Sequence, residues 1–170
     1  MTALAGRPAH RSAREWIDTL GLEPLAGESG WWAPHFRSAV PVASDLGDTT
    51  ACNVIYYLLD AERPINAWHR LASDDTHMLL DGGPVEYLTV ADDGIVRTTL
   101  LHADHPVISI PAGSSKALRL IDGAAFALMG SVVTPAWTPE RVRIEPPDLA
   151  ERPGWLTDAL MSALTTGIPG

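Results

Sequence analysis

Ionisable side chains gather in the stretch INAWHRLASDDTHMLLDGG, residues 65–83, which has apolar runs on either side. It holds two of the chain's six histidines, His69 and His77, and the adjacent pair Asp74 and Asp75. Histidine titrates near neutral pH, and a carboxylate beside it stabilises its protonated form, so this composition suits acid–base chemistry. The same side chain types also ligate divalent metals. We interpret Asp74 as a turn residue rather than a second acid.

Strand periodicity predicts which neighbours share a face with these residues. Side chains two residues apart on a strand point the same way. If His69 and Asp75 point into a cavity, the residues that accompany them inward are Ala67, Leu71, His77 and Leu79. Trp68 and Arg70 then face away from it. This arrangement predicts a small polar cluster on apolar walls, which is typical of a small-molecule pocket.

The composition of the 170-residue chain excludes several classes of partner. Its 12 basic and 21 acidic residues give a net charge of −9, which repels nucleic acid phosphates and anionic lipid. No apolar run approaches the roughly 20 residues that span a bilayer, and the N-terminus lacks the apolar core of a signal peptide. Cys52 is the only cysteine, so no internal disulfide is expected. We expect a soluble, cytoplasmic protein that binds neither nucleic acid nor membrane.

A short helix and a series of strands are expected to position the ionisable residues. Ser12 and Glu15 have the spacing of a capping box, and an apolar helical face follows until Gly21. From Thr50 onward, short apolar or alternating runs are separated by turn residues, a pattern typical of an antiparallel sandwich or barrel. The runs are CNVIYYLL, INAWHRL, THMLL, VEYLTV, IVRTTLL, VISI, KALRLI and AAFALMGSVV. The sequence therefore predicts an all-β core.

The segment after Trp137 has a different composition. Residues 138–166 begin with a proline-rich stretch, which can lie on a surface but cannot form a central strand. The stretch WLTDALMSALTTG follows, and the residues that it places on one helical face are Trp155, Leu156, Ala159, Leu160, Ala163 and Leu164. We expect a C-terminal helix packed on the barrel. A chain of this length with 46% hydrophobic residues suffices for one core, so we interpret residues 1–170 as one domain with a barrel core at about 22–137.

Six segments occur in a fixed order from about Leu22 to Trp137: GESGWWAPHFRS, VIYYLL, AWHRLASDD, DGGPVEYL, HPVISIPAGS and ALMGSVVTPAW. Together they resemble the small single-domain cupins of the type-five class. The resemblance implies a jelly-roll β-barrel, a homodimer, and a functional site inside the barrel. The cupin superfamily includes metal-dependent oxygenases, metal-free sugar epimerases and isomerases, and plain binding proteins, so the fold does not settle the function.

The resemblance also assigns positions to metal ligands, and this chain departs from two of them. His69 stands for one histidine of the first cupin motif, Asp75 for its glutamate, and Ala67 for the other histidine. The second motif appears as PAGSSK, which puts the chain's only lysine, Lys116, at the remaining histidine position. An inward Lys116 brings Leu118 into the barrel with it.

Two chemistries remain open for this set of residues. Without a metal, His69 acts as base, Asp75 orients it, and Lys116 serves as acid, oxyanion stabiliser or Schiff-base former. This set suits proton abstraction next to a carbonyl and needs no cofactor. The alternative is a divalent metal held by His69, Asp75 and His77, which the Lys116 ammonium would repel.

Further residues are candidates for substrate binding. Arg37 could reach the mouth of the cavity and bind a carboxylate or phosphate, or instead pair with a surface carboxylate. Tyr56 and Tyr57 lie on opposite faces of one strand, so one of them faces inward, and Tyr57 is our candidate. His77 is either a ligand-binding residue or a core histidine held by Asp75. The apolar wall residues expected from strand alternation are Leu79 and Leu118.

We therefore expect a cupin that binds a small polar organic molecule inside its barrel. The leading function is a metal-independent isomerase, epimerase or cyclase. A non-catalytic small-molecule-binding protein is one alternative, and a metal-dependent oxygenase or lyase is the other. We expect a homodimer from the resemblance, and also because aromatic residues in the N-terminal segment offer apolar surface that a lone barrel leaves exposed. Trp31 and Trp32 cover either the barrel mouth or such a dimer contact.

Overall fold

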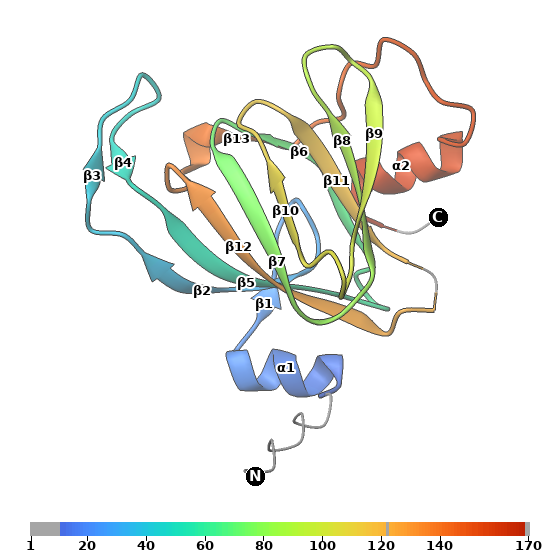
Figure 1. The fold of residues 1–170 in the computed structure, drawn as a ribbon, viewed down its shortest axis with the longest axis horizontal. Helices are drawn as coiled ribbons and strands as arrows, with labels where there is room; N and C mark the ends of the chain where they lie inside the picture. The colour runs from blue at the N-terminus through green and yellow to red at the C-terminus, as the bar shows by residue number, and fades with distance from the viewer. Residues whose placement is uncertain (1–10, 122, 169–170) are drawn as a thin grey trace.

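Two antiparallel β-sheets face each other and form the body of the molecule (Figure 1). The computed structural model describes residues 11–121 and 123–168 of the chain. The expectation that no signal peptide is present depends on residues 1–10, which lie outside the described residues. Neither of the α-helices in the described part of the chain is long and apolar enough to cross a membrane.

The elements confirm the expected all-β core with a helix near each end of the chain. In order they are α1 (Ala13–Leu20), β1 (Glu23–Pro24), β2 (Trp31–Arg37), β3 (Pro41–Val42), β4 (Thr49–Thr50), β5 (Asn53–Asp60), β6 (Ile65–Leu71), β7 (Asp74–Gly82), β8 (Val85–Val90), β9 (Val96–Leu101), β10 (Val107–Ile110), β11 (Ser115–Leu120), β12 (Phe126–Thr134), the short 3₁₀ helix η1 (Pro139–Arg141), β13 (Val142–Arg143) and α2 (Asp158–Thr166). One sheet has the order β1-β2-β5-β12-β7-β10, and the other has the order β13-β6-β11-β8-β9. Strands β3 and β4 pair separately. The two large sheets form a jelly-roll sandwich.

The expected capping box opens α1. The Ser12 hydroxyl accepts a hydrogen bond from the Glu15 amide N–H at 3.3 Å, and the Glu15 carboxylate accepts one from the Ser12 amide N–H at 2.7 Å. The buried Ile17 side chain packs with Leu58 and Leu128, which lie on the face of β5 and β12 that points away from the other sheet. The helix thus covers part of the outer face of the six-stranded sheet.

The inward faces of the strands divide the space between the sheets into two parts. Along β5, Asn53 and Ile55 line an open cavity, whereas Leu59 belongs to the apolar core. Along β12, Ser131 lines the cavity and Met129 belongs to the core. One end of the barrel is therefore filled by apolar side chains, and the other end holds the cavity.

The C-terminal helix α2 packs on the outer side of β6, as the sequence predicts. The Thr157 hydroxyl caps the helix by accepting from the Leu160 amide N–H at 3.2 Å. Leu164 and Trp68 are both buried in the cluster between the helix and the strand, so Trp68 faces away from the cavity as expected. The expected place of Trp155 on the buried helical face is wrong, because the helix begins after it and the side chain is 48% exposed.

Strands β2 and β13 border the cavity and lie where the sequence pattern predicts no strand. Strand β2 contains Pro34, and its register with β5 shifts between Pro34 and Phe36, because proline has no N–H to give to the ladder. Strand β13 lies within the proline-rich segment and pairs with the end of β6 at the edge of its sheet. These strands bring Trp32 and Val142 to the cavity.

Candidate functional site

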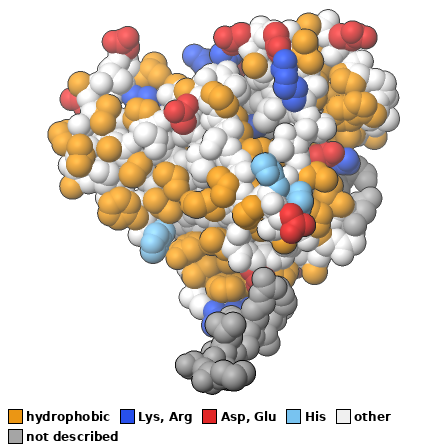
Figure 2. All heavy atoms as spheres, in the orientation of Figure 1, with side chains coloured by type: hydrophobic (Ala, Val, Ile, Leu, Met, Phe, Trp, Pro, Cys, Tyr) orange, Lys and Arg blue, Asp and Glu red, His pale blue; other side chains and the backbone are white. Residues whose placement is uncertain are grey.

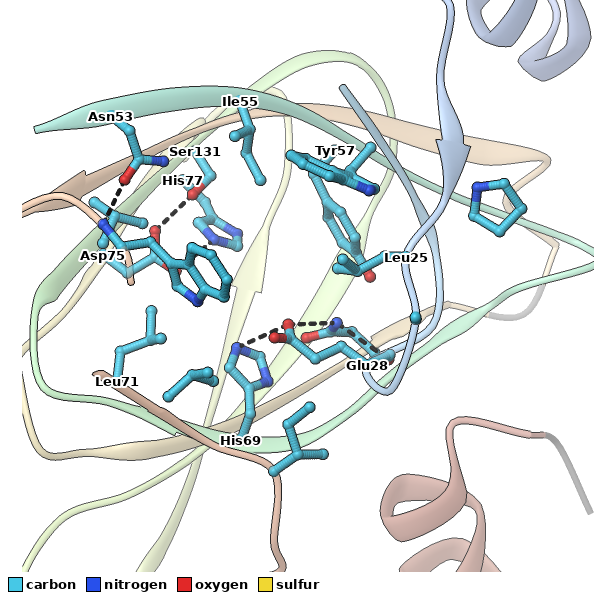
Figure 3. Close-up of a pocket in the computed structure, with 18 residues that line it drawn as sticks. Leu25, Glu28, Asn53, Ile55, Tyr57, His69, Leu71, Asp75, His77 and Ser131 are labelled. Carbon is cyan, nitrogen blue, oxygen red and sulfur yellow. Dashed lines mark hydrogen bonds and ion pairs between the residues drawn. The ribbon is translucent and has the colours of Figure 1, made fainter. Parts of the chain in front are cut away.

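A cavity of about 360 Å³ lies at the end of the barrel that the apolar core leaves open (Figure 3). Its walls come from both sheets and from the loop after β1, and they are mainly apolar. The lining residues with polar side-chain groups include Glu28, Asn53, Tyr57, Asn66, His69, Asp75, His77 and Ser131. An apolar wall with a few polar groups is the usual composition of a small-molecule pocket.

A β-bulge in β6 brings two of these polar residues onto one wall. The register with β11 shifts between Asn66 and His69, so β6 carries one extra residue there. Asn66 and His69 therefore both line the cavity, although they are three residues apart. The expectation that Ala67 faces inward with His69 is wrong, because simple alternation does not continue through a bulge. Leu71, which follows the bulge, lines the cavity as expected.

The His69 ring is fixed by the backbone of the bulge. Its Nδ1 lies 2.8 Å from the Ala67 carbonyl oxygen, and because a carbonyl oxygen only accepts, Nδ1 carries the proton. In the neutral imidazole, Nε2 then has a free lone pair, and it lies 3.6 Å from Glu28 Oε2. The bulge thus holds His69 in the tautomer that presents Nε2 as a base.

Glu28 is a site residue that the sequence analysis does not find. It lies in the loop after β1, and its backbone is held against β6 (Figure 3). The Glu28 carbonyl oxygen accepts hydrogen bonds from the Ala67 amide N–H at 2.7 Å and from Asn66 Nδ2 at 3.2 Å. Asn66 Nδ2 also lies 3.5 Å from Glu28 Oε2. Only the fold brings Glu28 to His69, so no local sequence signal marks it.

The electrostatic surroundings keep His69 neutral. Burial lowers the pKa of His69, and the Glu28 carboxylate partly offsets this shift. The Lys116 ammonium lowers the pKa further, whereas the Ala67 carbonyl and the Asp75 carboxylate raise it. Because the net shift of the pKa is downward, the imidazole is unprotonated at neutral pH and can accept a proton.

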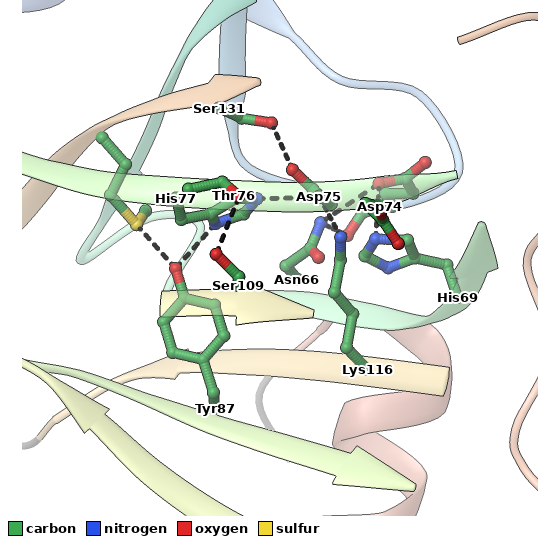
Figure 4. A network of polar contacts seen from close by, with 12 residues as sticks. Asn66, His69, Asp74, Asp75, Thr76, His77, Tyr87, Ser109, Lys116 and Ser131 are labelled. Carbon is green, nitrogen blue, oxygen red and sulfur yellow. Dashed lines mark hydrogen bonds and ion pairs between the residues drawn. The ribbon is translucent and has the colours of Figure 1, made fainter. Parts of the chain in front are cut away.

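Asp75 is the centre of a buried polar network beside this pair (Figure 4). Its Oδ2 accepts hydrogen bonds from Lys116 Nζ and, at 2.9 Å, from His77 Nε2. Its Oδ1 accepts one from the Ser131 hydroxyl at 2.8 Å. These groups come from β7, β11 and β12, so the network joins the two sheets. Ser131 is a further residue that the sequence analysis does not single out.

The network keeps Asp75 ionised and gives it another role than the one expected. Burial alone would raise the pKa of Asp75, but the charges of His77 and Lys116, and the hydrogen bonds from both, lower the pKa well below the usual range of an aspartate. Its charge therefore balances that of Lys116. The expectation that Asp75 orients His69 is wrong, because the orienting hydrogen bond of His69 goes to the Ala67 carbonyl.

His77 is held between two partners and also lines the cavity. Its Nε2–H donates to Asp75, and its Nδ1 lies 2.7 Å from the Tyr87 hydroxyl. Burial raises the pKa of Tyr87 well above its usual value, and Asp75 adds to the shift, so the phenol keeps its proton. That hydroxyl also lies 3.2 Å from Met129 Sδ. His77 is thus a core histidine with one face toward the cavity.

Of the other strand residues that the sequence predicts in the site, some line the cavity and some lie in the core. Lys116 is buried, and its side chain lies behind the cavity wall rather than in it. Leu79 and Leu118 belong to the apolar core, so their expected place in the wall is wrong, because the cavity ends before these positions on β7 and β11. Tyr57 lines the cavity, and Tyr56 packs on the outer face of the sheet.

Tyr57 fixes the loop that carries Glu28. Its hydroxyl donates to the Ser29 carbonyl oxygen at 2.9 Å. Gly30 leaves room for the ring, since a Cβ at that position would lie 2.2 Å from the Tyr57 hydroxyl oxygen. Gly30 also has a φ of +85°, which favours glycine.

Arg37 holds a wall residue instead of lining the cavity itself. Its guanidinium donates to the Trp137 carbonyl oxygen and to Thr49 Oγ1, both at 3.2 Å, and within the described part of the chain it forms no ion pair. The Trp137 amide N–H donates to Asn53 Oδ1 at 2.7 Å. The amide oxygen of Asn53 is thus occupied, and its Nδ2 has no hydrogen-bond partner among the described residues.

The residues of the metal alternative, His69, Asp75 and His77, are not arranged as metal ligands. His77 Nε2–H donates a hydrogen bond to Asp75, so this nitrogen has no lone pair for a metal. Both oxygens of Asp75 accept hydrogen bonds from protein donors, and one of these donors is the Lys116 ammonium. In the described ranges, no three His, Cys, Asp or Glu side chains lie where they could share an ion. A donor set in this arrangement does not fit a divalent metal.

Comparison with known proteins identifies relatives of this fold. A family model described as Cupin superfamily (DUF985) matches residues 14–144. A hypothetical protein from Leishmania major is similar in structure, with a TM-score of 0.72 and 25% identity over 78% of this chain and 86% of that chain. A protein from Shewanella oneidensis gives a TM-score of 0.73 and 20% identity over 94% of this chain and 99% of that chain. Oxalate decarboxylase from Bacillus subtilis gives a TM-score of 0.50 and 14% identity over 70% of this chain and 29% of that chain. No curated protein matches the chain.

Proposed function

The chain belongs to the DUF985 family of the cupin superfamily, and from this premise we propose that its barrel binds a small organic molecule and moves a proton on it. The proposed reaction class is that of a metal-independent isomerase, epimerase or cyclase, which removes a proton from a carbon next to a carbonyl. The observation that carries the proposal is the buried, neutral His69, whose Nε2 lone pair lies beside Glu28 in a mainly apolar cavity.

His69 is the base of the proposed reaction. Its Nε2 takes the proton from the substrate carbon, the electron pair of the C–H bond forms a C=C bond, and the carbonyl π pair moves onto the oxygen to give an enolate. The Glu28 carboxylate, 3.6 Å away, stabilises the imidazolium that results. Return of the proton to another carbon, or to the other face of the same carbon, completes isomerisation or epimerisation.

Asn53 is the proposed donor to the substrate oxygen. Because its Oδ1 accepts from the Trp137 amide N–H, its NH₂ group remains for a ligand in the cavity. Figure 3 shows Asn53 and His69 on different walls of the cavity, so a substrate between them can meet both groups. A positioned donor of this kind stabilises the charge that develops on an enolate oxygen.

Lys116 is a positioning residue in this proposal. Its ammonium is bonded to Asp75 and lies behind the wall, so Schiff-base formation or direct proton donation is not part of the reaction. Lys116 instead neutralises Asp75, which in turn holds His77 and Ser131 at the cavity wall.

Hydrogen–deuterium exchange tests the reaction without knowledge of the natural substrate. Benzylacetone, a neutral aryl ketone that matches the apolar walls, is incubated with the protein in D₂O, and loss of the signals of the protons next to the carbonyl is followed by ¹H NMR. We expect protein-dependent exchange that falls about 10²-fold or more in His69→Gln, the size typical for loss of a general base. His105→Gln, which changes an exposed turn histidine, is the matched control.

A second outcome would favour the non-catalytic alternative. If benzylacetone binds in the cavity, as shown by chemical-shift changes of residues such as Trp32 and Ile55, but no exchange depends on His69, the protein is a binder and not an isomerase. The self-contained hydrogen bonding of Asp75, Lys116 and His77 is the observation that favours this second candidate.

A further inference from the structure

The Glu28 carboxylate has no lysine or arginine partner within the described part of the chain. The residues that line the cavity include the two acids Glu28 and Asp75, and no lysine or arginine is found among those the structure describes. Lys116 and His77 are both bonded to Asp75, and neither forms an ion pair with Glu28 among the described residues. Burial holds the pKa of His69 down, so the imidazole supplies no compensating charge at neutral pH. The partners of the Glu28 carboxylate in the described part of the chain are therefore His69 and Asn66 alone, and it lies in a mainly apolar space.

One oxygen of that carboxylate has no partner. Glu28 Oε2 lies near Asn66 Nδ2 and His69 Nε2, whereas Oε1 has no hydrogen-bond partner among the described residues. The Glu28 side chain is only 17% exposed. A carboxylate oxygen without a protein partner on the wall of a mainly apolar cavity is free to accept from a ligand that brings a hydrogen-bond donor, and a charged donor makes the stronger bond.

Aromatic side chains around the cavity suit the same kind of ligand. Trp32 on β2 and Trp137 after β12 both line the cavity, and the Tyr57 ring lies on the wall near the Glu28 loop. The faces of such rings carry negative potential and attract cations. They also bury apolar carbon, so this lining fits a cation attached to a hydrophobic skeleton.

Anionic ligands have no equivalent support. Arg37 donates its hydrogen bonds to Thr49 and to the Trp137 carbonyl, and it does not line the cavity. A carboxylate or phosphate in the cavity would therefore lie near Glu28 without a protein cation to compensate it.

We propose that the ligand of this cavity is a protonated amine with an apolar carbon skeleton. The N–H groups donate to Glu28 Oε1, and the skeleton packs against Trp32, Trp137 and the aliphatic wall. This inference rests on the proposed function only in taking the same cavity as the ligand site, since binding of an amine requires no turnover. It defines the substrate class of the proposed reaction as carbonyl compounds that also carry an amine.

Three probes of similar size and different charge test the inference. They are phenethylamine, which is protonated near neutral pH, phenethyl alcohol, which is neutral, and phenylacetate, which is anionic. Their affinities are measured by NMR titration of the full chain at low ionic strength. We expect phenethylamine to bind about tenfold or more tightly than either other probe, because it alone can form a hydrogen bond between opposite charges with Glu28.

Glu28→Gln should reduce the affinity for phenethylamine about tenfold or more and leave that for phenethyl alcohol unchanged. Glu23→Gln is the matched control, since it removes the same charge from an exposed position on β1 outside the cavity. Equal or tighter binding of phenylacetate, an amine preference that survives Glu28→Gln, or no binding of the amine at millimolar concentration would overturn the inference. Amine binding without His69-dependent exchange would leave it standing and remove the isomerase proposal instead.

Discussion

His69 Nε2 and Glu28 Oε2 lie 3.6 Å apart, although the two residues come from different elements, a strand and a loop. The pair lies on the cavity wall, and the proton of His69 is held on the other ring nitrogen by a backbone carbonyl. A proton accepted from a ligand therefore arrives on the nitrogen that faces a carboxylate. The pair combines a base that is neutral at rest with a group that stabilises its charged form.

Glu28→Gln should lower the pKa of His69 further. Burial and the Lys116 ammonium lower this pKa, and the Glu28 carboxylate raises it. Without the carboxylate, the pKa should fall further. Histidine ring signals followed by NMR against pH measure the change, with Glu23→Gln as control. An upward shift of the His69 pKa in Glu28→Gln would contradict the assigned electrostatics.

Lys116→Met should destabilise the fold by about 3–5 kcal/mol, because it leaves the buried charge of Asp75 without its cation. The double variant Lys116→Met with Asp75→Asn should recover a large part of that loss, since neither charge remains. Chemical unfolding measures both. Arg119→Met, which removes a partly exposed partner of Glu86, is the control and should cost about 0–1 kcal/mol.

A Lys116→Met variant as stable as the unaltered protein would show that the Lys116–Asp75 pair is not needed for the fold. Failure of Asp75→Asn to rescue it would show that the cost comes from lost packing of the lysine stem and not from the unpaired charge.

The free energy of unfolding should decrease at acidic pH because Asp75 becomes protonated. Its pKa in the folded state is lowered, so it contributes stability that is fully present above the unfolded value of about 3.9 and is lost as the pH falls below it. The free energy of unfolding measured against pH should therefore decline more steeply for the unaltered protein than for Asp75→Asn. Asp104→Asn, at an exposed turn, should keep the steep decline. Identical slopes for all three proteins would contradict the role of Asp75.

Gly30→Ala should destabilise the protein more than Gly47→Ala. Both glycines have positive φ, +85° and +92°, so both substitutions carry a backbone cost of about 1–2 kcal/mol. Only at Gly30 would the new Cβ collide with the Tyr57 hydroxyl, whereas nothing lies within 4 Å at Gly47. We expect a further loss of about 1–3 kcal/mol at Gly30 from overpacking, measured by thermal unfolding. Equal losses at the two positions would show that the Tyr57 ring moves freely.

The homodimer stays a prediction, and its basis shifts from Trp31 and Trp32 to another surface. Trp32 lines the cavity and Trp31 packs with the cluster under α1, so neither leaves a large free surface. Leu80 and Val107, on the neighbouring strands β7 and β10, are 52% and 47% exposed. Figure 2 shows hydrophobic side chains gathered in several groups on the face of the molecule seen there. Such patches are typical of interfaces.

Light scattering should give about twice the chain mass of 18.2 kDa. Leu80→Glu should shift the protein toward the monomer, while Leu100→Glu on β9, at a similar exposure of 45%, should not. A monomer at micromolar concentration for the unaltered protein would show that no stable dimer forms.

The strands were predictable where one face of each strand is apolar and turn residues mark its ends. The runs VEYLTV and VISI correspond to β8 and β10 without change. Strand β2 was not predicted, because Pro34 interrupts its hydrogen-bond ladder and the adjacent Trp31 and Trp32 break the alternation of polar and apolar residues. Register in a strand can be inferred from alternation only where no residue is added, and Ala67 is such an addition in β6.

The site was predictable only in part. His69, Asp75 and His77 stand out because they are ionisable residues within apolar strands, and all three line the cavity. Glu28 did not stand out, because an acidic residue in a polar loop is ordinary and its contact with His69 depends on the folded chain. The contact of His77 with Asp75 was among the alternatives that the sequence offered. The contact of Ser131 with Asp75 was beyond it, since Ser131 comes from a distant strand and gives no signal of its own.

The extra residue in β6 contributes to the site through its backbone alone. The carbonyl group of Ala67 fixes the His69 tautomer, and the N–H group of Ala67 holds the Glu28 loop. The methyl side chain of Ala67 makes neither contact. Deletion of Ala67 would keep Asn66 and His69 on one face of a regular ladder, yet both of these backbone contacts would be lost. What the site requires of β6 at this point is therefore a segment length rather than a residue type. Substitution scans cannot reveal it, whereas single-residue deletions and insertions along the strand can.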